Sequence, residues 1–295
     1  MFNGSLVALV TPFADGALDL ETLRELVHFQ LDSGIDGIVP VGTTGESPTL
    51  SHEEHKQVIQ VVVEEVGGRV PVIAGAGSNS TAEAIELTRF AKIIGADATL
   101  QIVPYYNKPT QEGLYQHFKA IAESTDLPVI LYNVPSRTGS NIEPATVARL
   151  SKISNIIGIK EASGSITQQM QVLDAVGPGF RVLSGDDAFT LPLMALGGVG
   201  VISVVANEIP GPMTKLAHLM LEGKLEEARK LHFQLLPLMQ ANFIETNPIP
   251  VKAALAMMGM IKEVYRLPMV PMKPENRAKL EKALAAHGLL QAKEA

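Results

Sequence analysis

Eight short runs of apolar, largely β-branched residues recur along this chain of 295 residues, and a turn and a helix-like segment follow most of them. The runs are nearly continuous in hydrophobicity and do not alternate with polar residues, which is typical of strands buried on both faces of a parallel sheet. We predict strands at residues 5–10, 37–41, 70–75, 98–103, 128–133, 156–160, 181–185 and 199–205.

Amphipathic segments lie between the strands. The pattern predicts helices at residues 20–34, 52–66 and 80–95. Two of them begin with the spacing of a capping box, Ser51 with Glu54 and Ser80 with Glu83, in which each side chain caps the backbone N–H of the other residue.

Repeated strand–helix units over about 220 residues predict a (β/α)8 TIM barrel. A doubly wound open sheet remains an alternative, because a count of strands does not separate the two folds. After residue 224 the pattern changes to helical segments at 225–245, 250–262 and 275–287 with no strands between them. We therefore predict a catalytic barrel over residues 1–224 and a C-terminal helical domain over 225–295.

Composition narrows the classes of function. A net charge of −7 argues against a nucleic-acid-binding surface, which is normally basic. The chain has no cysteine, which excludes thiolate catalysis and cysteine metal sites. No histidine pair falls at a strand end, so we expect no metal and no cofactor. The opening residues carry no basic leader and no apolar run approaches membrane length, so we expect a soluble cytoplasmic protein that binds no membrane.

The C-terminal ends of barrel strands are where active sites form. Reactive side chains follow several of the predicted strands at this end. They are Thr43, Thr44, Tyr105, Tyr106, Asn107, Lys108, Tyr132, Arg137, Lys160, Asp186 and Asp187.

Lys160 is the most informative of these residues, because it closes the apolar run IIGIK. Withdrawal from water disfavours the charged form of an amine, and the neutral form is the nucleophile. The alternative is a structural ion pair with Glu161 or another carboxylate. Lys108 is a rival candidate at a strand end, but its polar neighbours predict greater exposure.

Three further features fit a reactive lysine. Tyr132 ends the neighbouring strand and can relay protons, although a core tyrosine is the alternative. Arg137 can clamp a carboxylate, although a surface arginine is the alternative. The loop GTTGES (42–47) offers N–H groups and hydroxyls to a carboxylate, and it lacks the spacing of a P-loop.

The segments GTTGES (42–47), YNVPSRTG (132–139) and IIGIKEAS (156–163), in this order and spacing, resemble the dihydrodipicolinate synthase and N-acetylneuraminate lyase superfamily. The resemblance covers the whole chain, and the threonine pair and the PSRTG loop are similar to its synthase branch. It implies condensation of pyruvate with L-aspartate 4-semialdehyde in lysine and diaminopimelate biosynthesis.

The resemblance also implies a role for individual residues. Lys160 would form an imine with pyruvate, and Tyr132, Thr43 and a Tyr106 from the partner subunit would relay protons. The pyruvate carboxylate would be held at Thr44, Gly185 and Ile202, and the carboxylate of the aldehyde at Arg137. The implied assembly is a homotetramer, a dimer of dimers.

A second set of residues concerns regulation. His52 and His55 lie three residues apart at the start of one predicted helix, where a protonated histidine opposes the helix dipole. Lysine-inhibited members of the superfamily have matching histidines together with residues matching Ser47, Asn79, Glu83 and Tyr105. The resemblance therefore implies feedback inhibition by L-lysine. The alternative is two solvated histidines without a ligand.

Two other functions stay open on the sequence alone. One is a lyase of the same superfamily that acts on N-acetylneuraminate or a 2-keto-3-deoxy sugar acid. Arg137 argues against it, because those enzymes usually lack an arginine in this loop. The other is a catalytically silent barrel that senses keto acids. The presence of Lys160, Tyr132 and Thr43 together argues against a pure binder, which needs no proton relay.

Overall fold

The computed structural model describes residues 1–290. The strands are β1 (Gly4–Ala8), β2 (Phe13–Ala14), β3 (Ala17–Leu18), β4 (Gly37–Val39), β5 (Ile73–Gly75), β6 (Ala98–Ile102), β7 (Val129–Asn133), β8 (Ile156–Glu161), β9 (Arg181–Ser184) and β10 (Gly200–Ser203). The helices are α1 (Leu20–Asp32), α2 (His52–Val66), α3 (Thr81–Ile93), α4 (Gln111–Glu123), α5 (Pro135–Thr138), α6 (Pro144–Leu150), α7 (Ile166–Ala175), α8 (Thr190–Ala195), α9 (Pro210–Leu221), α10 (Leu225–Ala241), α11 (Ile249–Met257) and α12 (Pro274–Ala286).

The eight predicted strands form one sheet in the order β4-β1-β10-β9-β8-β7-β6-β5, and neighbouring strands in this order pair in parallel. A parallel bridge between Ile38 and Val72 joins the two ends of this order. The Ile38 and Gly75 N–H groups also donate to Pro71 O and Pro40 O, each at 3.0 Å. The sheet therefore closes into the predicted barrel, and the open doubly wound sheet is excluded.

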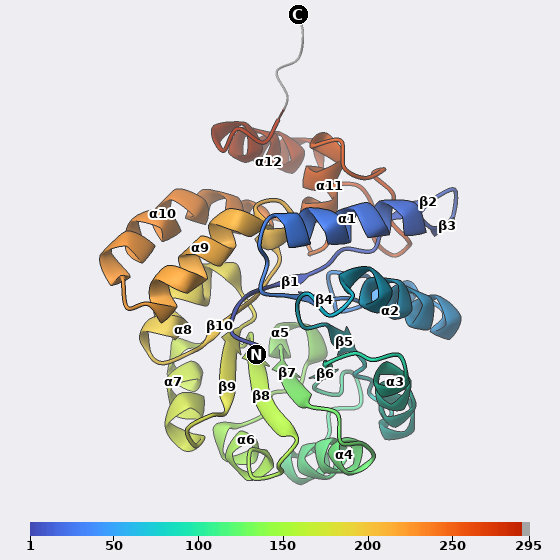
Figure 1. The fold of residues 1–295 in the computed structure, drawn as a ribbon, viewed down its shortest axis with the longest axis vertical. Coiled ribbons are helices and arrows are strands. Elements are labelled where there is room, and N and C mark those ends of the chain that lie inside the picture. Colours follow the sequence, from blue (N-terminus) through green and yellow to red (C-terminus); the bar gives the residue numbers. More distant parts are fainter. Residues whose placement is uncertain (291–295) are drawn as a thin grey trace, which may run out of the picture.

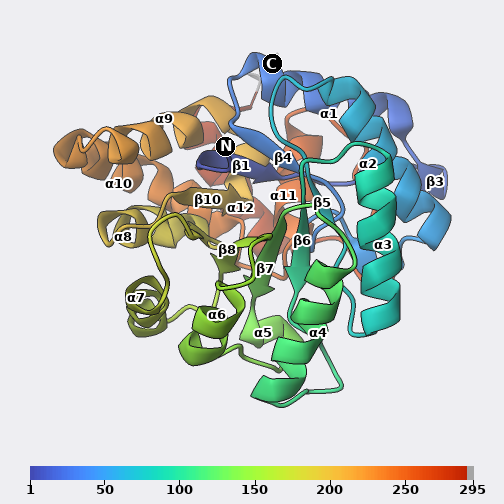
Figure 2. The same ribbon diagram turned by 60° about the horizontal axis from the view of Figure 1, so that its bottom comes forward.

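Helices surround the barrel, as Figures 1 and 2 show. The capping box at the start of α2 is confirmed, since Ser51 and Glu54 cap each other. The capping box predicted for α3 is wrong, because the Ser80 side chain makes no cap. The Glu83 carboxylate instead bonds to the Ser78 hydroxyl and to His52. The short hairpin of β2 and β3 was not predicted, because each of its strands has only two residues.

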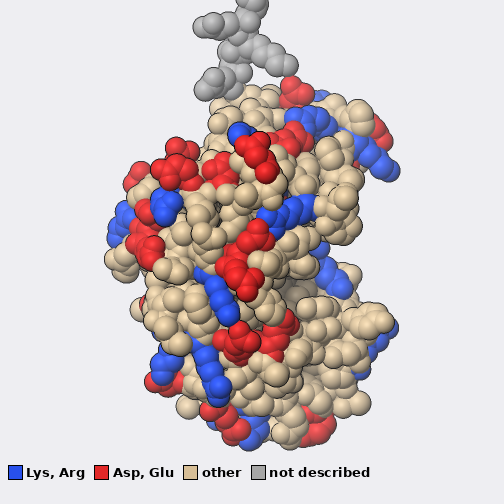
Figure 3. Space-filling model, turned by 90° about the vertical axis from the view of Figure 1, so that its right-hand side faces the viewer, with Lys and Arg blue, Asp and Glu red and all other residues tan. Residues whose placement is uncertain are grey.

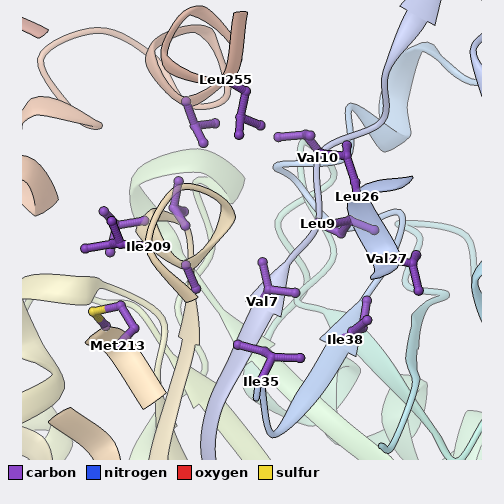
Figure 4. Packing of buried hydrophobic residues seen from close by; sticks show 14 of the residues in the cluster. Val7, Leu9, Val10, Leu26, Val27, Ile35, Ile38, Ile209, Met213 and Leu255 are labelled. Carbon is purple, nitrogen blue, oxygen red and sulfur yellow. The ribbon is translucent and has the colours of Figure 1, made fainter. Parts of the chain in front are cut away.

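Apolar contacts join the C-terminal helices to the barrel. One buried cluster includes Val7 and Val10 near β1, Leu238 of α10, Leu255 of α11 and Leu280 of α12. Figure 4 shows Leu255 lying across from Val10. The predicted boundary at residue 224 falls between α9 and α10, and residues 291–295 of the predicted C-terminal domain lie outside the described residues.

The surface carries both signs of charge. In Figure 3 the acidic and basic side chains are interspersed over the face shown. Within residues 1–290, no helix is both long enough and apolar enough to cross a bilayer. Over the same range, no three His, Cys, Asp or Glu side chains gather into a potential metal site.

Candidate active site

Lys160 and Tyr132 lie side by side near the C-terminal ends of two adjacent strands. They are register partners across β7 and β8, so their side chains leave the sheet on the same face. Both are buried, and Lys160 is only 5% exposed. The Lys160 Nζ atom lies 4.4 Å from the centre of the Tyr132 ring. The structure therefore places an amine and a phenol together at the active-site end of the barrel.

The structure argues against an ion-pair role for Lys160. The Glu161 carboxylate accepts hydrogen bonds from Ser163 N at 2.7 Å, Asn133 Nδ2 at 3.1 Å and Gln168 Nε2 at 3.3 Å. Among the described residues, no acidic side chain forms an ion pair with Lys160. The rival Lys108 is exposed, as expected.

Gly185, directly after β9, makes room for the Lys160 side chain. A Cβ atom at this position would lie 2.6 Å from Ala162 Cβ and 3.0 Å from Lys160 Cε. This close approach explains why a residue without a side chain stands beside the amine.

Two acidic residues follow Gly185. Burial raises the pKa of both Asp186 and Asp187, the latter to about 6. The Lys160 charge opposes the rise of the Asp186 pKa.

The loop GTTGES (42–47) winds tightly after β4. Gly45 N donates to Gly42 O at 3.1 Å, and Glu46 N donates to Thr43 O at 3.1 Å. The Thr11 hydroxyl donates to Gly45 O at 2.7 Å and ties the loop to the chain after β1. These bonds hold the backbone of the loop in place, and Thr44 within it is buried, at 2% exposure.

Sequence reasoning missed Asn247, which lies in the segment between α10 and α11. Its Nδ2 donates to Thr44 Oγ1 at 3.0 Å, and its backbone carbonyl accepts from Arg137 Nη2 at 3.2 Å. The contacts span 203 and 110 residues of sequence, so no local pattern could reveal them. Arg137 is exposed, but its guanidinium is tethered to the C-terminal segment and is not a free surface group.

A cavity of about 470 Å³ opens beside these groups. Three of the predicted catalytic and substrate-binding residues line it: Thr43, Tyr132 and Arg137. Five residues predicted for regulation line it too: Ser47, His52, His55, Glu83 and Tyr105. Two sets of residues that were singled out for different reasons therefore meet in one continuous space.

The regulatory set is held by hydrogen bonds. His52 Nε2 lies 2.7 Å from Glu83 Oε1, and the Ser78 hydroxyl bonds to the other oxygen of Glu83. The Ser78 bond, followed by His52, lowers the pKa of Glu83, so a carboxylate faces the cavity. Asn79 Nδ2 donates to Tyr105 O at 3.2 Å.

His55 differs from its neighbour His52 in its surroundings. It is buried, its Nε2 lies 2.8 Å from Gly75 O, and burial lowers its pKa. The alternative of two solvated histidines is therefore wrong for His55.

Six of the predicted site residues do not line this cavity: Lys160, Thr44, Asn79, Tyr106, Gly185 and Ile202. Tyr106 is 89% exposed, and its backbone has a positive φ of 72°. Ile202 of β10 belongs to the cluster inside the barrel that also contains Tyr132. The chain alone therefore brings Lys160, Tyr132, Thr43, Thr44, Gly185 and Arg137 to one end of the barrel, while Tyr106 points to solvent.

Chemically, the arrangement suits imine catalysis. A buried amine can attack a keto group, and a phenol beside it can move the protons that imine formation requires. Buried hydroxyls and an arginine suit carboxylate groups on the substrates.

Comparisons with known proteins identify the family of this chain. The family model described as "Dihydrodipicolinate synthetase family" matches residues 1–287. The 4-hydroxy-tetrahydrodipicolinate synthase of Syntrophus aciditrophicus is 58% identical over 290 residues, which cover 98% of this chain and 100% of the relative.

Solved structures show the same fold. The chloride-inhibited dihydrodipicolinate synthase of Acinetobacter baumannii complexed with pyruvate has a TM-score of 0.96 and 47% identity, and the match covers 98% of this chain and 100% of the other. The enzyme from Cyanidioschyzon merolae with lysine bound has a TM-score of 0.95 and 43% identity, covering 98% and 99%. The chain is an enzyme of the lyase class and belongs to the dihydrodipicolinate synthetase family.

Proposed function

We propose that the chain condenses pyruvate with L-aspartate 4-semialdehyde through an imine at Lys160, giving 4-hydroxy-tetrahydrodipicolinate and water. The observation that carries the proposal is the buried Lys160 amine, which lies against Tyr132 and forms no ion pair with a described acidic residue. Relatives that carry this enzyme name support the choice of reaction.

The reaction proceeds in four steps. The Lys160 amine adds to the keto carbon of pyruvate, and the carbinolamine loses one water to give the imine. Loss of a methyl proton gives the enamine, whose carbon attacks the aldehyde and forms the new C–C bond. The amino group of the semialdehyde then attacks the imine carbon, closes the ring and releases Lys160. Tyr132 and Thr43 would carry the protons in these steps.

The two substrates each bring a carboxylate. We assign that of pyruvate to Thr44, with Gly185 and Ile202 shaping the space around it. We assign that of the semialdehyde to Arg137, which lines the cavity. The pyruvate complex of the Acinetobacter baumannii enzyme supports pyruvate as the first substrate.

We place Tyr106 in the active site of a partner subunit within a homotetramer. Its ring is 89% exposed on its own chain, which is unusual for an aromatic residue without a partner. Sedimentation analysis should give particles of four chains, and a stable active monomer would rule out this role. A cytoplasmic location stays a prediction from the sequence.

An assay of substrate consumption tests the proposed function. The purified chain should consume L-aspartate 4-semialdehyde only when pyruvate is present, and it should not cleave N-acetylneuraminate. Cleavage of the sugar acid without turnover of the semialdehyde would favour the alternative lyase. Binding of pyruvate without turnover of either compound would favour a keto-acid sensor.

We further propose that L-lysine inhibits the enzyme from the part of the cavity lined by Ser47, His52, His55, Glu83 and Tyr105. The Glu83 carboxylate suits the amino groups of lysine, and the structure of the Cyanidioschyzon merolae enzyme contains bound lysine. The site shares its cavity with Thr43 and Tyr132, so a ligand there can affect the reaction.

Turnover is expected to fall when millimolar L-lysine is added. Glu83→Ala should raise the concentration for half-inhibition by at least about tenfold, because a charge-assisted hydrogen bond to the ligand is lost. His28→Ala is the control, since His28 pairs with Glu65 outside the cavity and its loss should leave inhibition unchanged. Turnover that L-lysine does not affect would contradict the proposal.

A further inference from the structure

Asn247 connects the C-terminal helices to the mouth of the barrel. It is 4% exposed, and its side-chain amide donates to Thr44 Oγ1 at 3.0 Å. Its backbone carbonyl accepts from Arg137 Nη2 at 3.2 Å. Asn247, which lies outside the barrel, therefore contacts both Thr44 and Arg137, the side chains that we propose bind the carboxylates of the two substrates.

The direction of the bond to Thr44 has a chemical consequence. A threonine hydroxyl has one proton to donate and two lone pairs that accept. Since the Asn247 amide occupies a lone pair of Thr44 Oγ1, the hydroxyl proton stays available for another acceptor. A carboxylate only accepts hydrogen bonds, so a hydroxyl held in this way suits a carboxylate ligand.

A second contact fixes Asn247 relative to the loop that carries Thr44. Lys252 of α11 forms an ion pair with Glu46 of that loop, with Nζ and Oε1 2.5 Å apart and both side chains buried. The Lys252 N–H donates to Pro248 O at 3.0 Å, which ties the start of α11 to the residue after Asn247. The loop and the C-terminal segment are joined at two points, so the amide and the hydroxyl are held in place before a ligand arrives.

We propose that Asn247 is a positioning residue of the pyruvate site, which acts by holding the Thr44 hydroxyl as a donor to the carboxylate of the 2-keto acid. This inference rests on the proposed function. It also gives the C-terminal helices a part in substrate binding, which the sequence did not predict.

Two variants test the proposal through pyruvate binding. In Asn247→Asp, the new carboxylate accepts a hydrogen bond from the Thr44 hydroxyl, which is then no longer available to the ligand, and it adds a negative charge near the ligand. In Asn247→Ala, the hydroxyl only loses its partner. The yield of borohydride-trapped adduct is measured as a function of pyruvate concentration. The concentration that gives half of the maximal yield should rise at least about tenfold in the aspartate variant and about threefold in the alanine variant.

The KM for the second substrate distinguishes a specific effect on the pyruvate site from general disruption of the active site. At saturating pyruvate, the KM for L-aspartate 4-semialdehyde should stay within about twofold of wild type. The reason is that Arg137 contacts the backbone carbonyl of residue 247, which both variants keep.

Asn155→Ala is the matched control. Its Nδ2 donates to Ala122 O at 2.9 Å and Thr125 O at 3.1 Å at the other end of the barrel, so both substrate constants should be unchanged. Equal effects of the aspartate and alanine variants, or a parallel rise of both substrate constants, would overturn the proposal. A wild-type protein that forms no pyruvate adduct would instead refute the proposed function on which it rests.

Discussion

Replacing Lys160 with alanine is expected to lower kcat/KM for the condensation by about a hundredfold to a thousandfold. The variant loses the covalent route, while the rest of the site still binds and orients the substrates. The substitution also removes the contact between the Lys160 amine and the Tyr132 ring. Initial rates of semialdehyde consumption at several pyruvate concentrations measure the loss.

Lys152→Ala is the control for this variant. Lys152 is exposed in the turn before β8, at the opposite end of the strand from Lys160, so its loss should not change the rate. Activity of the Lys160 variant within about tenfold of wild type would show that the imine is not the main route.

Replacing Lys252 with methionine is expected to lower the free energy of unfolding by about 3–5 kcal/mol. The substitution leaves the Glu46 carboxylate, which is 3% exposed, buried without its cation. Burial lowers the pKa of the Lys252 amine, while Glu46 opposes that shift and favours the charged form. The Lys252 Nζ also donates to Thr11 O at 3.1 Å, and this bond is lost as well. Urea denaturation followed by circular dichroism measures the change.

A double variant separates the ion pair from packing. Glu46→Gln in the Lys252→Met background removes the uncompensated charge and should recover part of the lost stability. The exposed pair of Lys224 with Glu222 is the control, and Lys224→Met should leave the unfolding midpoint nearly unchanged. A small effect of Lys252→Met would mean that water or a shifted side chain replaces the lysine.

The strands of the barrel could be predicted because burial on both faces leaves continuous apolar runs such as IIGIK and PVILYN. The position of Lys160 at the end of such a run was enough to single out its amine. Helix starts were predicted less well. The serine–glutamate spacing was right at Ser51 but wrong at Ser80, because Glu83 bonds to partners outside its own helix.

Contacts between distant segments could not be predicted. Asn247 and Lys252 lie more than 200 residues from their partners Thr44 and Glu46, and hydrophobic periodicity carries no information at that separation. Both residues fall where the sequence predicted a separate helical domain. The structure shows that this segment also completes the surroundings of the loop after β4.

Trapping the imine on the wild-type protein shows directly whether Lys160 forms the covalent bond to pyruvate. The protein is incubated with pyruvate and sodium borohydride, digested and mapped by mass spectrometry. We predict that the peptide containing Lys160 gains the mass of pyruvic acid less one oxygen atom, and that Lys108 stays unmodified. The absence of an adduct on Lys160, or an adduct on another lysine, would contradict this prediction.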